Sequence, residues 1–282
     1  MVGYNVQSAV DVKNHLIVAH EVTNQGHDRQ QLFAISELAR VVLGTASLDV
    51  VADRGYFSLR ELEKCYAGGI FPTMPVPQTS NNISKGLFNK RDFKYIEADD
   101  EYECPAGERL EWRTRTHEGA MLVDKYWTSA CTDCPWKSNC TSETNPFRRI
   151  ARSESEELTE HMLMRLETEP DRMKIRRSTV EHPFGTIKHW MGHTHFQMKG
   201  IGNVATEMSL HVLAYDMKRC INLVGVASLL EAIREMARLQ ASLMVVLRGF
   251  VGAFQSYYLK TLGVIDVAQK IFHAPDDHCA YF

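Results

Sequence analysis

The chain has 282 residues and a formal net charge of -3. Its apolar content of 44% and charged content of 24% are ordinary for a soluble globular protein. This charge excludes a globally basic protein, so an interaction with nucleic acid would depend on a local patch. The sequence shows neither a long uninterrupted apolar run nor a signal-peptide pattern, so we expect a cytoplasmic protein with no membrane partner.

Residues 1–76 predict the first part of a mixed α/β core. Residues 4–10 and 16–23 are rich in β-branched residues and are joined by a polar turn, which favours an antiparallel pair of strands. Apolar residues then recur at helical spacing up to Gly44, and Asp28 is a candidate cap for this helix. The stretch "SLDVVAD" predicts a buried strand, which is followed by an amphipathic helix and the short strand "IFPTMPV". The order β-β-α-β-α-β indicates one mixed sheet with short connections.

The rest of the chain predicts an insertion, a return to the core and a tail. Residues 77–170 carry short aromatic and polar strands, four of the seven cysteines and an acidic helix-like run, so we interpret them as an inserted β-rich module. Residues 171–225 are predicted to complete the core, with a long helix over 203–224 that ends before Gly225. Residues 226–282 predict a helical tail.

Asp53 is the first candidate metal ligand. It ends an apolar strand in the stretch "DVVADRGYFS", and Arg54-Gly55 turns the chain directly after it. A carboxylate at the mouth of a buried strand can coordinate a metal ion. A solvated turn aspartate is the alternative interpretation.

Glu181, in the stretch "RRSTVEHPFGTIKHW", is the second candidate. Lys188 follows it by two helical turns and Arg177 precedes it by one, so the three side chains can share a helix face. A carboxylate between two cations suits metal-dependent phosphodiester chemistry, in which the carboxylate holds Mg²⁺ and the cations hold phosphate oxygens. Alternatively, Ser178 and Glu181 form a capping box at a helix start, where Pro183 would be tolerated.

The segment around Glu181 is locally basic. Residues 171–199 contain six Lys or Arg against two Asp or Glu, a composition that favours contact with DNA phosphates. Trp190 could stack on a base near a strand end, although packing in the core is the alternative. The candidate phosphate contacts are Lys174, Arg176, Arg177 and Lys188.

Four cysteines fall in the predicted insertion with the spacing C-x26-C-x2-C-x5-C. The C-x2-C pair is a common zinc-knuckle spacing, because one tight turn brings both thiolates to one metal. Reduced free thiols, an iron–sulfur cluster and a redox function remain alternatives. The candidate zinc ligands are Cys104, Cys131, Cys134 and Cys140.

Seven motifs of the chain occur together in one order. They are "YNVQSAVD", "LIVAHEVTN", "VVADRGYF", "CPAGERL", "YWTSACTDCPWKSNC", "VEHPFGTIKHWMG" and "TEMSLHVLAYDMKR". Over residues 3–225 the chain resembles the bacterial insertion-sequence transposases of the DDE class. Arg177, Glu181 and Lys188 match the spacing Arg-x3-Glu-x6-Lys that this class carries around its last catalytic carboxylate. Lys174 stands where the class has a tyrosine.

The resemblance implies an RNase H-like fold, with an insertion between the last strand and the helix that bears the catalytic Glu. By position, Asp53 resembles the second catalytic Asp and Glu181 the catalytic Glu. In such enzymes three carboxylates bind two Mg²⁺ or Mn²⁺ ions, which support cleavage at the element's ends and transfer to target DNA. The expected partner is therefore DNA.

The family carries its first catalytic Asp on a strand that precedes the segment matching "GYNVQSAVD", where this chain begins. We therefore expect a C-terminal portion of a transposase that lacks the first strand, the first carboxylate and the N-terminal DNA-binding region, and that is inactive in strand transfer alone. One alternative is a DNA-binding remnant that interferes with a full-length transposase at element ends or in mixed oligomers. Another is a nonspecific metal-dependent nuclease that uses Asp11, Asp53 and Glu181, although Asp11 fits a solvated turn.

Overall fold

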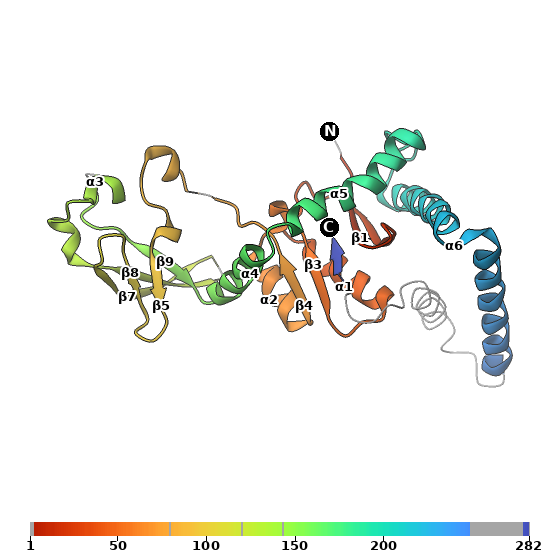
Figure 1. Cartoon of the computed structure of the whole chain (residues 1–282), viewed down its shortest axis with the longest axis horizontal. Helices are drawn as coiled ribbons and strands as arrows, with labels where there is room; N and C mark the ends of the chain where they lie inside the picture. The colour runs from red at the N-terminus through yellow and green to blue at the C-terminus, as the bar shows by residue number, and fades with distance from the viewer. Residues whose placement is uncertain (1–2, 79, 120, 143, 249–278, 282) are drawn as a thin grey trace. The chain divides into compact units, whose positions relative to one another are not determined.

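The computed structural model describes residues 3–78, 80–119, 121–142, 144–248 and 279–281 (Figure 1). The chain forms two compact units. The first combines Met1–Val76 with His161–Phe282, and the second is Pro77–Glu160. Helix α4 (Glu156–Thr168) contains the second boundary, at the place where the sequence predicts an acidic helix.

The first unit contains a five-stranded mixed sheet in the order β2-β1-β10-β3-β4. β1 pairs antiparallel with β2, which confirms the predicted strand pair, and β3 pairs parallel with β4. β10 joins these two halves, because it pairs antiparallel with β1 and parallel with β3. The strands are β1 (Asn5–Asp11), β2 (Ile17–Thr23), β3 (Leu48–Val51), β4 (Ile70–Thr73) and β10 (Cys279–Tyr281).

The central strand β10 was not predicted from the sequence. The predicted helical tail is confirmed as far as Arg248, where α6 (Ile201–Arg248) ends in the described chain. It is wrong for Cys279–Tyr281, which form a strand, and residues 249–278 lie outside the described residues. α6 also contains the predicted break, because Gly225 has non-helical angles of φ 82 and ψ 161.

One face of the sheet is covered by α1 (Leu32–Leu43) and α2 (Leu59–Ala67), which pack on each other and on the strands. Because side chains alternate along a strand, Leu48, Val50 and Ala52 all point into this core. α1 ends at Gly44 in the left-handed region, as predicted (φ 64). The predicted Asp28 cap is wrong, since the residue before α1 is Gln31 and the Asp28 side chain accepts hydrogen bonds elsewhere.

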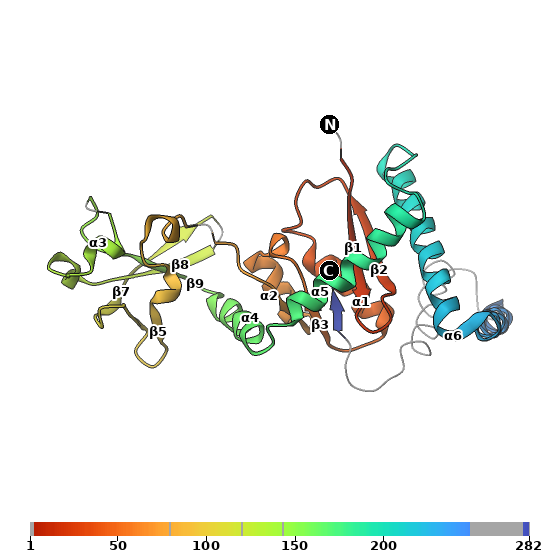
Figure 2. The same cartoon turned by 45° about the horizontal axis from the view of Figure 1, so that its top comes forward.

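The other face is covered by α5 (Arg172–Gly185), the π-helical turn η5 (Thr186–Trp190) and the first part of α6. Val10, Ile17 and Val22 of the strands pack there against Ile187 and Met208. α5 itself packs against β1, β10 and β3. Figures 1 and 2 show α5 crossing the strands of this sheet.

The second unit is an antiparallel sheet in the order β5-β6-β7-β8-β9. Its core is small and consists of Phe93, Tyr102, Leu110, Tyr126 and Ile150. The elements are β5 (Lys94–Ile96), β6 (Glu101–Glu103), β7 (Arg109–Glu118), β8 (Met121–Trp127), β9 (Ile150–Ser153), the short helix α3 (Lys137–Cys140), and the turns η2 (Ile83–Lys85), η3 (Lys90–Asp92) and η4 (Ser129–Thr132).

No helix within the described residues combines the length and apolar character needed to cross a membrane.

Replacement of Ala280 by proline is expected to destabilise the first unit. Proline removes a backbone donor from the middle of a central strand, so the free energy of unfolding should fall by about 1–3 kcal/mol. Hydrogen exchange of β1 and β3 amides, together with urea unfolding, measures this effect. Ala280→Ser keeps the N–H and is the matched control; equal exchange in both variants would contradict a structural role for β10.

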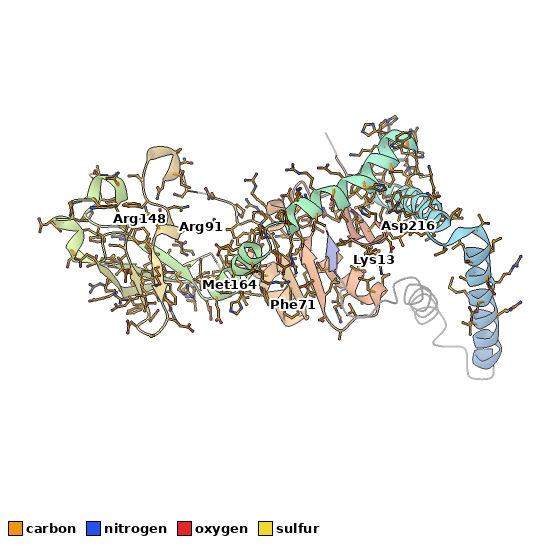
Figure 3. All side chains as sticks on the ribbon, viewed as in Figure 1. Lys13, Phe71, Arg91, Arg148, Met164 and Asp216 are labelled. Carbon is orange, nitrogen blue, oxygen red and sulfur yellow. The ribbon has the colours of Figure 1, made fainter. Side chains whose placement is uncertain are left out.

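Asp216 of α6, labelled in Figure 3, should make the stability of the first unit depend on pH. Its Oδ1 accepts a hydrogen bond from the Ile17 backbone N–H at 3.0 Å, and burial raises the pKa of its carboxyl from 3.8 to about 7. Because the folded state holds this proton more tightly than the unfolded state, the stabilisation is complete below about pH 4 and is lost as pH rises through about 7. Asp216→Asn keeps an acceptor and stays neutral. Between pH 4 and pH 8 its stability relative to the unmodified chain should therefore rise by about 4 kcal/mol in urea unfolding; a constant difference would contradict the assignment.

Candidate functional site

Asp53 lies just beyond β3, where it caps η1 (Arg54–Tyr56). Its Oδ1 accepts a hydrogen bond from the Arg54 backbone N–H at 2.7 Å, and the residue is exposed to solvent. The cap explains why an acid follows the buried strand, as the turn interpretation proposed. Since the cap uses one carboxylate oxygen, the exposed side chain can still offer the other to a metal ion.

Glu181 lies deep inside α5, nine residues after Arg172, where the helix begins. The capping-box interpretation is therefore wrong, and the Ser178 hydroxyl instead donates to the Ile175 carbonyl at 2.8 Å. Pro183 also lies within the helix rather than in its first turn. Glu181 is an exposed helical carboxylate.

Three predicted cations share the solvent face of α5 and η5 with Glu181. Lys174, Arg177 and Glu181 follow one another at α-helical spacing, Lys188 lies in the π-helical turn that follows, and all four are exposed. Lys188 Nζ lies 5.8 Å from the centroid of the Phe184 ring. We refer to these four residues as the α5 stripe.

Arg176 differs from the α5 stripe. It is half-buried, and its charge acts on Tyr56 by lowering the pKa of that phenol, against the stronger effect of burial. Neighbouring Arg172 is held by carboxylates, at 2.5 Å from Glu169 and 3.6 Å from Asp49. The basic segment thus divides into cations that hold the fold and cations that face solvent.

A polar cluster beside Asp53 was missed by the sequence analysis. Asp28 Oδ1 accepts hydrogen bonds from Asn5 Nδ2 at 2.6 Å and from Gln7 Nε2 at 2.7 Å. The Tyr56 hydroxyl donates to Gln7 Oε1, and the carboxylates of Asp28 and Asp53 both help burial to raise the pKa of Tyr56. These partners are 21 to 49 residues apart, so no local pattern could indicate them. The cluster fixes the turn that carries Asp53.

Asp53 and α5 belong to the same face of the sheet. Residues two apart on a strand point to one side, so Asp53 has the same orientation as Asp49. Asp49 forms ion pairs with Arg165 of α4 and Arg172 of α5. The described residues nevertheless contain no group of three or more His, Cys, Asp or Glu side chains arranged to hold a metal ion. The two predicted acids, Asp53 and Glu181, therefore lie in the same unit, but among the described residues they do not form a complete metal site.

Asp11 is not brought to Asp53. In the hydrogen-bonded sheet, Asp11 of β1 pairs with Ala280 of β10, and Ala280 pairs in turn with Val50 of β3. Asp53 lies three residues further along and two strands across, which is about 10 Å in each direction. At this backbone separation the two aspartate side chains do not reach a common ion, because each carboxylate oxygen would have to lie within 2.0–2.6 Å of it. Asp11 Oδ2 instead accepts from the Asn14 backbone N–H at 2.6 Å, which confirms the turn interpretation.

The aromatic and histidine residues near Glu181 have different environments. Trp190 is 85% exposed, so the core-packing interpretation is wrong for it. His182 is exposed, but its Nδ1 lies 2.9 Å from the Tyr215 hydroxyl, and partial burial lowers its pKa. Lys188 lines a pocket together with Tyr4 and His195.

The four cysteines of the predicted zinc set line one pocket in the second unit. Cys65 is buried in the core of the first unit, and burial raises the pKa of its thiol to about 12.

Residues 103–221 match the family described as "Transposase DDE domain". Over these residues the chain is similar to the DDE-class transposases. The match includes Glu181 and the α5 stripe, while Asp53 lies outside it. No curated protein and no solved structure matches the chain. DDE transposases act in transposition by cutting and transferring DNA, and they normally use divalent metal ions.

The Asp28 cluster generates a prediction about stability. Asp28→Ala leaves the Nε2 group of buried Gln7 without its acceptor, so the free energy of unfolding should fall by about 1–3 kcal/mol. Asp28→Asn is the matched control, because it keeps an acceptor oxygen and should cost less. Urea unfolding followed by circular dichroism measures both variants, and an alanine variant as stable as the asparagine variant would contradict the role of the cluster.

Proposed function

We propose that this chain is a DNA-binding portion of a DDE transposase, in which Asp53 and Glu181 are metal ligands and Arg177 and Lys188 contact phosphate. The observation that carries the proposal is the α5 stripe, which exposes a carboxylate and three cations along α5 and η5. Lys and Arg at such spacing follow a phosphate backbone, and the carboxylate between them is free for a metal ion. Arg176 acts indirectly, since its half-buried side chain lies close enough to Tyr56 to affect its pKa.

The fold that we propose is RNase H-like. It is supported by a mixed sheet with helices on both faces, and by an independent unit between β4 and the helix that bears Glu181. We further propose that β10 occupies the position of the strand that the resemblance places ahead of β1. That position is central in the sheet, between β1 and β3.

The carboxylate chemistry of Asp53 and Glu181 suits a hard divalent cation. Mg²⁺ is commonly held by one or two carboxylates together with substrate phosphate oxygens, and Asp53 and Glu181 are both exposed acids of the first unit. A bound Mg²⁺ or Mn²⁺ would supply a nucleophile by lowering the pKa of a bound water. Asp53 would be held for this role by its turn and the Asp28 cluster, and Glu181 by the packing of α5.

Strand transfer by this chain alone is not expected. The resemblance implies three carboxylates, whereas β10 consists of Cys279, Ala280 and Tyr281, and Asp11 is about 14 Å from Asp53 by the ladder register. Two carboxylates hold a metal ion weakly, while phosphate contacts do not depend on it. Binding to element ends or target DNA is therefore the activity that this chain retains.

Interference with a full-length transposase would require a second surface. We propose the exposed apolar side of α6 as the place where another transposase chain associates, because its residues recur at three- and four-residue spacing. They are Leu210, Leu213, Met217, Ile221 and Val224.

DNA binding tests the proposal most directly. With a labelled duplex of random sequence and EDTA present, fluorescence anisotropy should show binding that weakens steeply with salt. Arg177→Ala and Lys188→Ala should each lower the affinity and reduce the slope of log K against log salt by about 0.9. Arg60→Ala is the matched control, since Arg60 is an exposed cation of α2 on the other face of the sheet.

Two further variants separate binding from cleavage. Asp53→Asn and Glu181→Gln should keep the affinity measured in EDTA, because neither residue contacts phosphate. The absence of salt-sensitive binding would overturn the DNA-binding proposal. Mg²⁺- or Mn²⁺-dependent nicking of supercoiled plasmid, lost in both variants, would support the metal ligands and overturn the proposed inactivity.

A further inference from the structure

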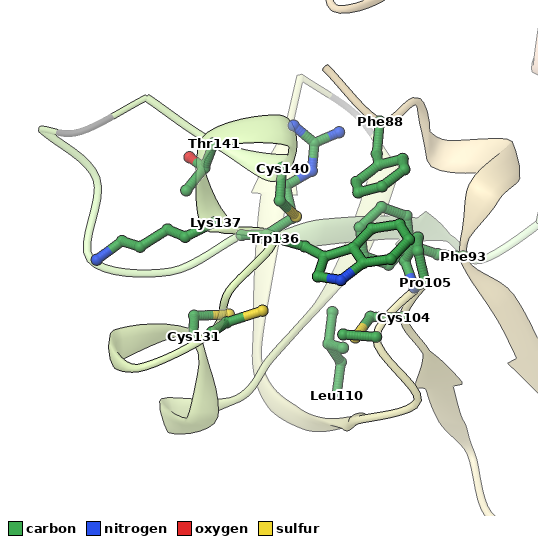
Figure 4. A pocket seen from close by; sticks show the side chains of 13 residues that line it. Phe88, Phe93, Cys104, Pro105, Leu110, Cys131, Trp136, Lys137, Cys140 and Thr141 are labelled. Atoms are coloured by element: carbon green, nitrogen blue, oxygen red, sulfur yellow. The ribbon is translucent and has the colours of Figure 1, made fainter. Parts of the chain in front are cut away.

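Four cysteines that are up to 36 residues apart come together in the second unit (Figure 4). Cys104 follows β6, Cys131 lies in η4, Cys134 follows η4, and Cys140 ends α3. All four line one small pocket beneath the stacked rings of Phe88 and Trp136, whose centroids are 5.7 Å apart.

Two of these cysteines lie in tight backbone turns. The Cys104 carbonyl accepts from the Gly107 N–H and the Cys104 N–H donates to the Glu108 carbonyl, both at 2.9 Å. Gly107 has a φ of 82, a backbone conformation that residues other than glycine rarely adopt. The Cys134 carbonyl likewise accepts from the Lys137 N–H at 3.1 Å. Such turns present a thiol together with nearby backbone N–H groups, as in metal-binding knuckles.

Arg148 lines the same pocket as the four cysteines, and its Nε–H is buried without a hydrogen-bond partner among the described residues. An unpaired guanidinium N–H beside thiolates is suited to a hydrogen bond with sulfur.

The segment formed by η4 and α3 is held weakly by packing. Neither element contains a buried residue, so the hydrophobic core contributes little to the position of this segment. Cys104 and Cys140, in contrast, pack against that core. A metal ion bound to all four thiolates would tie the segment to the sheet, and its binding free energy would stabilise the unit.

We propose that Cys104, Cys131, Cys134 and Cys140 bind one structural zinc ion. Four thiolates complete a tetrahedral site and leave no open position for substrate, so the ion is structural rather than catalytic. The sulfurs of the described structure do not form a ready-made metal group, so binding draws η4 and α3 inward. This site lies in a different unit from Asp53 and Glu181, and the inference does not depend on the proposed function.

Metal analysis of the purified full chain tests the proposal. One zinc per chain is expected, falling below about a tenth in Cys131→Ser and Cys134→Ser variants. Cys220→Ser is the matched control, because Cys220 is a half-buried cysteine of α6 and its variant should keep the zinc. Replacement of zinc by Co²⁺ should give the visible absorption bands of tetrahedral cobalt–thiolate coordination.

A thiol assay on the unmodified chain covers the case in which the serine variants fail to fold. A disulfide reagent should leave the four cysteines unreacted in the zinc-loaded chain and modify them rapidly once a zinc chelator is added. Equal rates with and without chelator would overturn the proposal, as would a chain that contains no zinc. Iron with acid-labile sulfide would also overturn it, in favour of an iron–sulfur cluster.

Discussion

The three residues of β10 hold together a sheet that otherwise consists of two separate pairs. β1 and β2 form an antiparallel hairpin, β3 and β4 form a parallel pair, and β10 supplies the backbone that both pairs share. A central strand must satisfy hydrogen bonds on two sides, so a strand of this length is a weak point in the ladder. The order of the whole first unit therefore depends on a contact between the end of the chain and its first strand.

The helix that carries Glu181 depends on the same contact. α5 packs against β3, β10 and β1 in one span, so its position requires the two halves of the sheet to be joined. The first turn of α5 is held by the ion pair of Arg172 with Asp49, and the η5 turn that follows α5 is held by Ile187 in the core that covers β1 and β2. The α5 stripe can consequently face solvent in full, because other residues of α5 and η5 perform the packing.

Local patterns predicted the elements of the first unit, but not the long-range contacts that complete it. β-branched runs predicted β1 and β2, and helical spacing with Gly44 predicted the end of α1. β10 could not be predicted, since three residues carry no periodicity and their partners are more than 200 residues away. The predicted capping box at Ser178 is wrong for a related reason. α5 already begins at Arg172, because the ion pair of Arg172 with Asp49 and the packing of α5 on the sheet override the local sequence signal. The local sequence favours Asp28 as a helix cap, whereas its partners Asn5 and Gln7 lie on β1.

The candidate metal ligands are of two chemical kinds, and each kind lies in a different unit. Exposed carboxylates in the first unit suit hard cations such as Mg²⁺, which bind weakly and share their ligands with phosphate. Thiols in the second unit suit zinc, which binds tightly and excludes other ligands. Since zinc also binds carboxylates, a tight thiolate site on the same chain would take up this ion and leave the acids to the more abundant hard cation. On the proposals made above, the chemistry of the ligands would assign DNA contact to the first unit and structural stabilisation to the second.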